Sequence, residues 1–139
     1  MTGLIVVLVA VAAAVSFGLY RRATDGRVRT VADGAPRLEA ADLGEGLGSA
    51  ATFVQFSSTV CAPCRATHAL LSDLTGDDPA VAHIDINAEE RLDLAERFGI
   101  LRTPTVLVLD GSGTVRQRIT GAPRRPEVLE ALASLQPTA

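Results

Sequence analysis

The feature that most restricts the fold is an uncharged apolar run at the N-terminus. Residues Leu4 to Tyr20 form seventeen consecutive positions, LIVVLVAVAAAVSFGLY. As a helix with a rise of 1.5 Å per residue the run is about 26 Å long, close to the ~30 Å hydrocarbon core of a bilayer. Tyr20, Arg21 and Arg22 are the aromatic and cationic residues typical of the end of a membrane span. We therefore expect a transmembrane helix over residues 1–20.

Two other interpretations of this run are a hydrophobic core helix and a cleaved signal peptide. The small residues around 10–14 could serve as a cleavage site. A signal peptide, however, carries positive charge before its apolar region, where residues 1–3 offer only the amino terminus. A core helix has no reason to end in an aromatic residue and two arginines. The residues favour a membrane anchor.

The charged residues are unevenly distributed. Residues 21–37 hold two aspartates and five arginines: Arg21, Arg22, Arg27, Arg29 and Arg37. The rest of the chain holds eight arginines and fourteen acids, so that the whole has a net charge of -3. This balance, with no basic face, argues against nucleic acid as a partner. The positive-inside rule predicts that the soluble part faces the cytoplasm, the extracytoplasmic side being the alternative.

The segment after the apolar run predicts a flexible basic tether. Residues 21–36 lack apolar periodicity and contain Gly26, Gly34 and Pro36. We accordingly expect one folded domain over residues 37–139, a usual length for a single globular domain.

The pattern within this domain predicts the order β-α-β-α-β-β-α. We expect strands at 52–56, 81–86, 105–109 and 115–120, helices at 61–74, 88–98 and from Pro126, and a weak helix at 38–47. Strand–helix–strand units build parallel sheets by right-handed crossovers, and the closing hairpin adds antiparallel strands at one edge. The expected fold is α/β, a mixed central sheet flanked by helices on both faces.

The two cysteines of the chain, Cys61 and Cys64, lie where the first strong strand ends and a helix begins. The dipole and free N–H groups at a helix N-terminus stabilise a thiolate at the first sulfur. Cys61 is therefore the predicted nucleophile. Cys64 lies one turn later on the same side, so it is the predicted resolving thiol. This chemistry, thiol–disulfide exchange, needs no cofactor.

Metal binding and redox-inert docking are the alternative functions. A structural zinc site needs four ligands, and only His68 and His83 are available to complete the cysteine pair. Covalent haem requires a histidine directly after the second cysteine, where the chain has Arg65. A metal-binding module would lose zinc on Cys61→Ser, whereas a docking domain would bind its partner without either cysteine.

From about residue 38 to 135 the chain resembles the thioredoxin family. The resemblance rests on the element order, on CAPC at 61–64 and on FGILRTPT at 98–105, which is similar to the family's cis-proline loop. It implies a thioredoxin-like fold with a cis bond between Thr103 and Pro104, where Thr103 pairs with the substrate main chain. It also implies protein disulfides as substrates and a reductase or other electron donor as a partner.

Three positions depart from the family pattern. Val60, within the expected substrate-binding surface, replaces a tryptophan, and Ala62 replaces a glycine. Gln55 lies where the family has a buried aspartate that manages the resolving thiol's proton, and Gln cannot act as an acid or base. The aspartate's usual lysine partner aligns with His83. One hypothesis is that a Gln55–His83 hydrogen bond replaces the ion pair and His83 titrates instead; the other is that His83 only has a neutral partner.

The function these features favour is a membrane-tethered protein-disulfide reductase. The alternative is an extracytoplasmic thiol–disulfide oxidoreductase of the cytochrome-maturation type, because members of that branch also have an N-terminal anchor and an altered active-site sequence. The chain has no room between Cys64 and Pro104 for the insertion which that branch carries.

Overall fold

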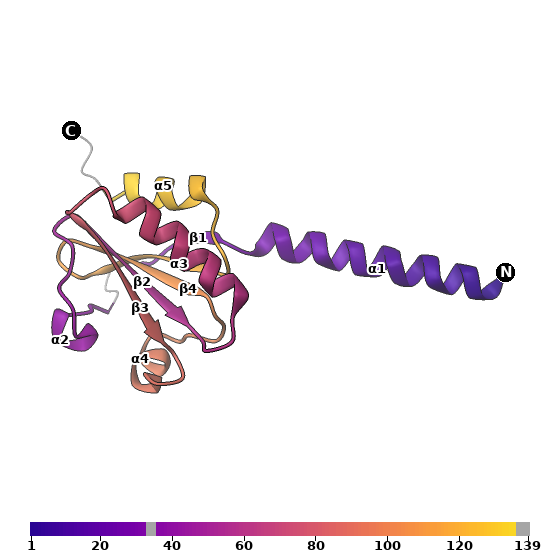
Figure 1. Ribbon diagram of the computed structural model, residues 1–139, viewed down its shortest axis with the longest axis horizontal. Coiled ribbons are helices and arrows are strands. Elements are labelled where there is room, and N and C mark those ends of the chain that lie inside the picture. Colours follow the sequence, from indigo (N-terminus) through magenta and orange to yellow (C-terminus); the bar gives the residue numbers. More distant parts are fainter. Residues whose placement is uncertain (33–35, 136–139) are drawn as a thin grey trace.

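In the computed structural model, which describes residues 1–32 and 36–135, a long helix projects from an α/β domain (Figure 1). This helix, α1 (Thr2–Thr24), is long and apolar enough to cross a membrane, and none of its residues is buried. It continues beyond the predicted end at Tyr20 through Arg21 and Arg22. Arginine is a good helix former, so the polar end of the span does not interrupt the helix.

The domain is built on a five-stranded mixed sheet with the order β1-β5-β4-β2-β3. The strands are β1 (Arg27–Thr30), β2 (Ala51–Ser57), β3 (Val81–Asn87), β4 (Thr105–Asp110) and β5 (Val115–Thr120). The β2–β3 pair is parallel, as a strand–helix–strand unit requires, and the pairs β2–β4, β4–β5 and β1–β5 are antiparallel. The expected mixed sheet is confirmed.

The expectation of a flexible tether over 21–36 is wrong for its central part. Arg27–Thr30 forms strand β1, which pairs with β5, and Val28 is opposite Ile119. The prediction failed because β1 has only one apolar residue among charged and polar ones, which gives no strand pattern. Since β1 covers β5, the closing hairpin does not form the sheet edge as expected. Residues 33–35 of the predicted tether lie outside the described residues.

Helices cover both faces of the sheet. They are α2 (Ala40–Leu43), α3 (Ala62–Thr75), α4 (Leu92–Arg97) and α5 (Arg125–Ala133). In Figure 1, α3 and α5 lie on one face and α2 and α4 on the other. Helix α4 begins later than the predicted start at residue 88, because residues 88–90 form a turn.

The alternation of side chains along β2 divides the core into two layers. Phe53 packs in the layer under α3 and α5 with Leu71 and Val128, whereas Val54 and Phe56 pack in the opposite layer. Gln55 is buried on the same face of β2 as Phe53, because alternate residues share a face. A polar side chain therefore lies under α3, directly below the cysteine pair.

Candidate active site

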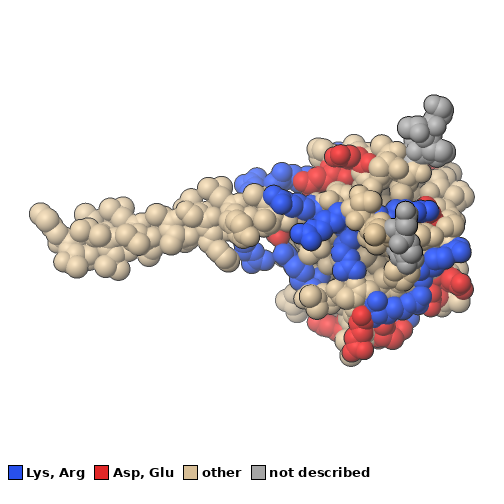
Figure 2. Space-filling model, turned by 180° about the vertical axis from the view of Figure 1, so that it is seen from behind, with Lys and Arg blue, Asp and Glu red and all other residues tan. Residues whose placement is uncertain are grey.

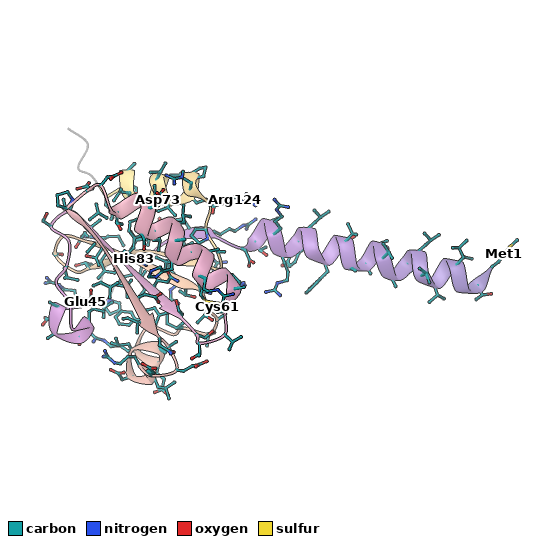
Figure 3. All side chains as sticks on the ribbon, in the orientation of Figure 1. Met1, Glu45, Cys61, Asp73, His83 and Arg124 are labelled. Atoms are coloured by element: carbon teal, nitrogen blue, oxygen red, sulfur yellow. A yellow bond between two sulfur atoms is a disulfide. The ribbon has the colours of Figure 1, made fainter. Side chains whose placement is uncertain are left out.

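The cysteine pair occupies the first turn of α3. Cys61 and Cys64 form a disulfide with their Cα atoms 5.2 Å apart. Cys61 is the N-cap residue, and its Sγ accepts a hydrogen bond of 3.2 Å from the backbone N–H of Cys64. The Cys64 side chain is buried, whereas Cys61 is half-buried at the domain surface, near the end of α3 labelled in Figure 3. The sulfur predicted to attack is therefore the more accessible one.

The loop before β4 lies against this disulfide. The Thr103–Pro104 peptide bond is cis. The Thr103 hydroxyl donates to Cys61 Sγ over 3.9 Å and shares a hydrogen bond of 3.0 Å with the hydroxyl of Ser58. The carbonyl of Pro104 accepts from the N–H of Gly121, which joins the loop to the end of β5. The sequence motif at 98–105 and the CAPC motif thus meet in space.

Exposed apolar side chains flank the site. Val60 is 92% exposed and Leu101 is 96% exposed, although both are large and hydrophobic. A groove of about 280 Å³ runs beside the loop, lined by residues that include Leu92, Leu101 and Thr103. Apolar surface of this kind around a reactive group is suited to a partner chain.

Gln55 connects the disulfide to the polar residues beneath it. Its Nε2 donates to the carbonyl of Cys64 over 2.8 Å and to the hydroxyl of Ser57 over 2.9 Å. Its Oε1 lies 3.1 Å from Nε2 of His83, so the expected Gln55–His83 hydrogen bond is present. An amide oxygen can only accept, so His83 carries its proton on Nε2 and its Nδ1 accepts from Ser72 over 3.3 Å.

His83 is an uncharged residue at neutral pH. Burial, together with the charge of neighbouring His68, lowers the pKa of His83 from 6.5 to about 4, and the carboxylate of Asp85 opposes this shift. The two imidazole rings lie 4.9 Å apart. Because the pKa lies so far below 7, His83 does not change its charge in the neutral range. The hypothesis that it handles protons during catalysis is thereby weakened.

Asp85 is a site residue that the sequence analysis missed. Its Oδ1 accepts from the hydroxyl of Ser57 over 2.6 Å, and its Oδ2 lies 2.9 Å from Nδ1 of His68. A cavity of about 380 Å³ is lined by Asp85, both cysteines and five other residues: Ser57, Ser58, Thr59, Arg65 and His68. The sequence spacing could have identified Asp85, because it follows His83 by two residues and alternate residues of a strand lie on the same face.

No metal site accompanies the cysteines in the described part of the chain. Within residues 1–32 and 36–135, no group of three or more His, Cys, Asp and Glu side chains is arranged to hold a metal ion. The zinc alternative therefore lacks a ligand cluster there.

Comparison with known proteins relates the domain to one family. The family model described as a thioredoxin-like domain matches residues 44–136. A thioredoxin H-type of Fagopyrum esculentum is 30% identical over 80 residues, which cover 58% of this chain and 67% of that protein. A chloroplastic thioredoxin of Arabidopsis thaliana is 36% identical over 78 residues, which cover 55% of this chain and 39% of that protein. The latter is therefore matched over well under half of its length.

Solved structures show the same fold. A mutant thioredoxin from Halobacterium salinarum superposes with a TM-score of 0.58 at 18% identity, covering 66% of this chain and 79% of that chain. A thioredoxin from Nicotiana alata superposes with a TM-score of 0.56 at 25% identity, covering 63% of this chain and 75% of that chain. The similarity lies in the α/β domain.

Proposed function

The chain belongs to the thioredoxin-like family of thiol–disulfide oxidoreductases, and from this premise we propose that it is a membrane-tethered protein-disulfide reductase. The observation that carries the proposal is the Cys61–Cys64 pair at disulfide distance in the first turn of α3, facing the loop at Thr103. Protein disulfides are the substrates, and a separate electron donor returns the pair to the dithiol.

In the proposed reaction, the Cys61 thiolate attacks one sulfur of the substrate disulfide. A mixed disulfide forms on Cys61, and the first substrate sulfur leaves as a thiolate that takes up a proton. The thiol of Cys64 then attacks the Cys61 sulfur, which forms the Cys61–Cys64 disulfide and releases the second substrate thiol. The Cys64 N–H and the helix dipole stabilise the attacking thiolate.

Substrate binding is assigned to the surface around the disulfide. We propose that the backbone at Thr103 and Pro104 pairs with an extended substrate chain, while Val60 packs against its side chains. The exposure of Val60 and the contact between Thr103 and Cys61 support this assignment. For Gln55 and His83 we propose a positioning role, holding the Cys64 carbonyl through neutral hydrogen bonds.

The tethering proposal assigns residues 1–20 to a membrane anchor and residues 37–139 to the redox domain, to which β1 adds an edge strand. It is supported by the apolar surface of α1 and by the arginines that follow it. The same arginines favour the cytoplasmic side for the domain.

The reduction potential of the cysteine pair tests this function. We would equilibrate the full chain in lipid nanodiscs with graded thiol buffers and measure the dithiol fraction by alkylation. A cytoplasmic reductase is expected to have a reduction potential of about -270 mV. A potential above about -180 mV would contradict it and favour the extracytoplasmic alternative of the cytochrome-maturation type. If the dithiol form of the chain reduced no protein disulfide at all, the redox-inert docking function would remain as the alternative.

A further inference from the structure

The sheet register brings the helix α1 and the disulfide to the same end of the domain. Arg27, Thr120, Thr105 and Phe56 are successive partners across β1, β5, β4 and β2. Arg27 begins β1 just after α1, and Phe56 lies five residues before Cys61. Since neighbouring strands are about 4.8 Å apart, the three steps of this row span about 14 Å.

The connection between α1 and the domain is short and fixed by contacts. Only Asp25 and Gly26 separate α1 from β1. The N–H of Gly26 donates to the carbonyl of Thr120 over 2.8 Å, and the carboxylate of Asp25 lies 2.6 Å from the guanidinium of Arg102. Arg102 directly precedes Thr103. The root of α1 is thus held against the loop that faces the disulfide.

The figures show this arrangement directly. In Figure 3, Cys61 lies on the side of the domain from which α1 departs. Figure 2 shows blue arginine side chains gathered around the base of the helix, where Arg27, Arg29, Arg102 and Arg118 line a cavity beside Tyr20. With α1 in a bilayer, the end of the domain that carries the disulfide faces the membrane surface, and arginines face the headgroups.

We infer that the physiological partner is an integral membrane protein whose cysteine pair lies at the membrane–water boundary on the same side. This inference rests on the proposed function and on tethering through α1. A soluble partner has to enter between the domain and the bilayer to reach Cys61. A disulfide at the membrane surface of an integral membrane protein already lies at the same height above the bilayer as Cys61. Exposed Val60 and Leu101 provide apolar contacts to such a partner.

The exchange with this partner is balanced without a further reactant. The partner's disulfide breaks and gains two electrons and two protons, becoming two thiols. The Cys61–Cys64 dithiol loses the same two electrons and two protons as its own disulfide forms.

The test measures whether the height of a disulfide above the bilayer controls its reduction. The full chain, in its dithiol form, is placed in vesicles with a synthetic single-span peptide whose disulfide-bonded cysteine pair follows the span directly. A second peptide carries the pair ten helical residues, about 15 Å, further out. A matched variant of the protein has twelve Gly and Ser residues inserted between Thr24 and Asp25, which keeps the contacts of Asp25 and Gly26.

We expect the unmodified chain to reduce the near disulfide about tenfold faster than the far one, and the insertion variant to lose this preference. Equal rates for the two peptides, or a preference that the insertion leaves unchanged, would overturn the inference. A soluble peptide with the same disulfide distinguishes failure of this inference from failure of the proposed function. If neither protein reduces it, the proposed function itself is wrong.

A second, independent observation concerns proton transfer at Cys64. Asp85 provides the single carboxylate among the described residues that line the cavity beside the cysteines. The charged or titratable groups facing it are Arg65 and His68 from α3 and His83 from its own strand. Gln55 cannot take a proton, and His83 is not among the described residues that line this cavity.

We propose that Asp85 accepts the proton of the Cys64 thiol, through water in this cavity, as Cys64 attacks the mixed disulfide. The S–H bond of Cys64 breaks, its electron pair forms the bond to Cys61, and the proton passes to the Asp85 carboxylate. The departing substrate thiolate then takes up a proton from solvent. The cavity of about 380 Å³ has room for the water, and Ser57 fixes the carboxylate by its hydrogen bond.

The test is the pH profile of disulfide reduction by Asp85→Asn in the full chain. We expect a loss of about tenfold at pH 7 that shrinks above pH ~8.5, where free thiols ionise without a base. Asp85→Glu is expected to retain most of the rate. Asp73→Asn, which removes a carboxylate of α3 that pairs with Arg125 outside this cavity, is the matched control and should leave the profile unchanged. A loss equal at every pH, or no loss, would overturn the proposal.

Discussion

Gln55 makes the interior beneath the cysteines neutral. Its amide is fully buried, and its hydrogen bonds to the Cys64 carbonyl, Ser57 and His83 offset the cost of removing it from water. No charge has to be buried at this position. The negative charge lies instead at the cavity wall, on Asp85, where it is partly exposed to solvent and paired with His68.

The low pKa of His83 has a consequence for acid stability. The folded state holds His83 with a pKa of about 4, whereas an unfolded chain restores the ordinary value of about 6.5. Between these two values the unfolded state binds more protons, so the free energy of unfolding rises with pH. The contribution is complete above pH ~6.5 and lost as pH falls toward 4. We expect His83→Gln to flatten this part of the profile, measured as urea midpoints at pH 4.5 and 7 in nanodiscs.

The control for this prediction is His68→Gln, which removes the chain's other histidine. The His68 side chain is 52% exposed, and its charge is only a secondary cause of the His83 shift. This variant should keep most of the pH dependence. If His83→Gln shows the same slope as the unmodified chain, His83 is not the group responsible.

Replacing the buried cysteine should trap the substrate. With Cys64→Ser, Cys61 can still attack, but no second thiol resolves the mixed disulfide. We expect a covalent adduct with a disulfide-bonded substrate, visible as a mass shift on a non-reducing gel and removed by reductant. Cys61→Ser should give no adduct above background. Equal trapping by both variants would mean that Cys64 also attacks substrate and that the assigned order is wrong.

At the scale of elements, the β2–α3 unit was predictable from local signals. Hydrophobic β-branched and aromatic residues mark β2, and helical spacing of apolar residues marks α3 up to the breakers after Leu74. The place of Cys61 at the start of the helix follows from these two boundaries. The loop at Pro104 was recognisable because its motif is contiguous in the sequence.

Elements that depend on distant partners were not predictable. Strand β1 is a strand because β5, almost ninety residues later, pairs with it, and its own residues carry a single apolar contact through Val28. Asp85 was missed for a related reason. Its role depends on Ser57 and on the cavity next to α3, and both arise only when β2, β3 and α3 pack together.

The junction between α1 and β1 is sensitive to a single methyl group. Gly26 has φ +78, and a Cβ there would lie 2.8 Å from the carbonyl oxygen of Ala122 and 3.0 Å from Cα of Pro123. Gly44 has a similar φ of +71, but no atom lies within 4 Å of its Cβ position. Gly44→Ala should therefore cost about 1 kcal/mol of unfolding free energy through backbone strain alone.

Gly26→Ala adds a steric clash with backbone atoms to the same strain. We expect it to lower the urea midpoint of the domain clearly more than Gly44→Ala does. We also expect it to reduce the preference for near over far disulfides, since β1 and α1 are no longer held in their native relation. Equal midpoints for the two variants would show that the backbone at Ala122 moves away without cost.

At the scale of the whole molecule, the fold ties orientation to chemistry. Helix α1 joins the domain at the end of the sheet that carries the disulfide, and only two residues separate α1 from β1. A domain on a long flexible linker would sample all orientations, and its linker would only raise the local concentration of the redox site. Under the proposed tethering, the short junction would also select which surface of the domain faces the bilayer.

The sidedness of the domain is the prediction that concerns the molecule as a whole. Arg21, Arg22, Arg27 and Arg29 follow the apolar run. The positive-inside rule therefore predicts that the domain faces the cytoplasm. We expect a membrane-impermeant maleimide to label the reduced chain in inverted membrane vesicles and not in right-side-out vesicles. Labelling after detergent treatment gives the total amount of reactive cysteine in the sample. Labelling of intact right-side-out vesicles would place Cys61 outside the cytoplasm, where the extracytoplasmic function and a more oxidising potential would be expected together.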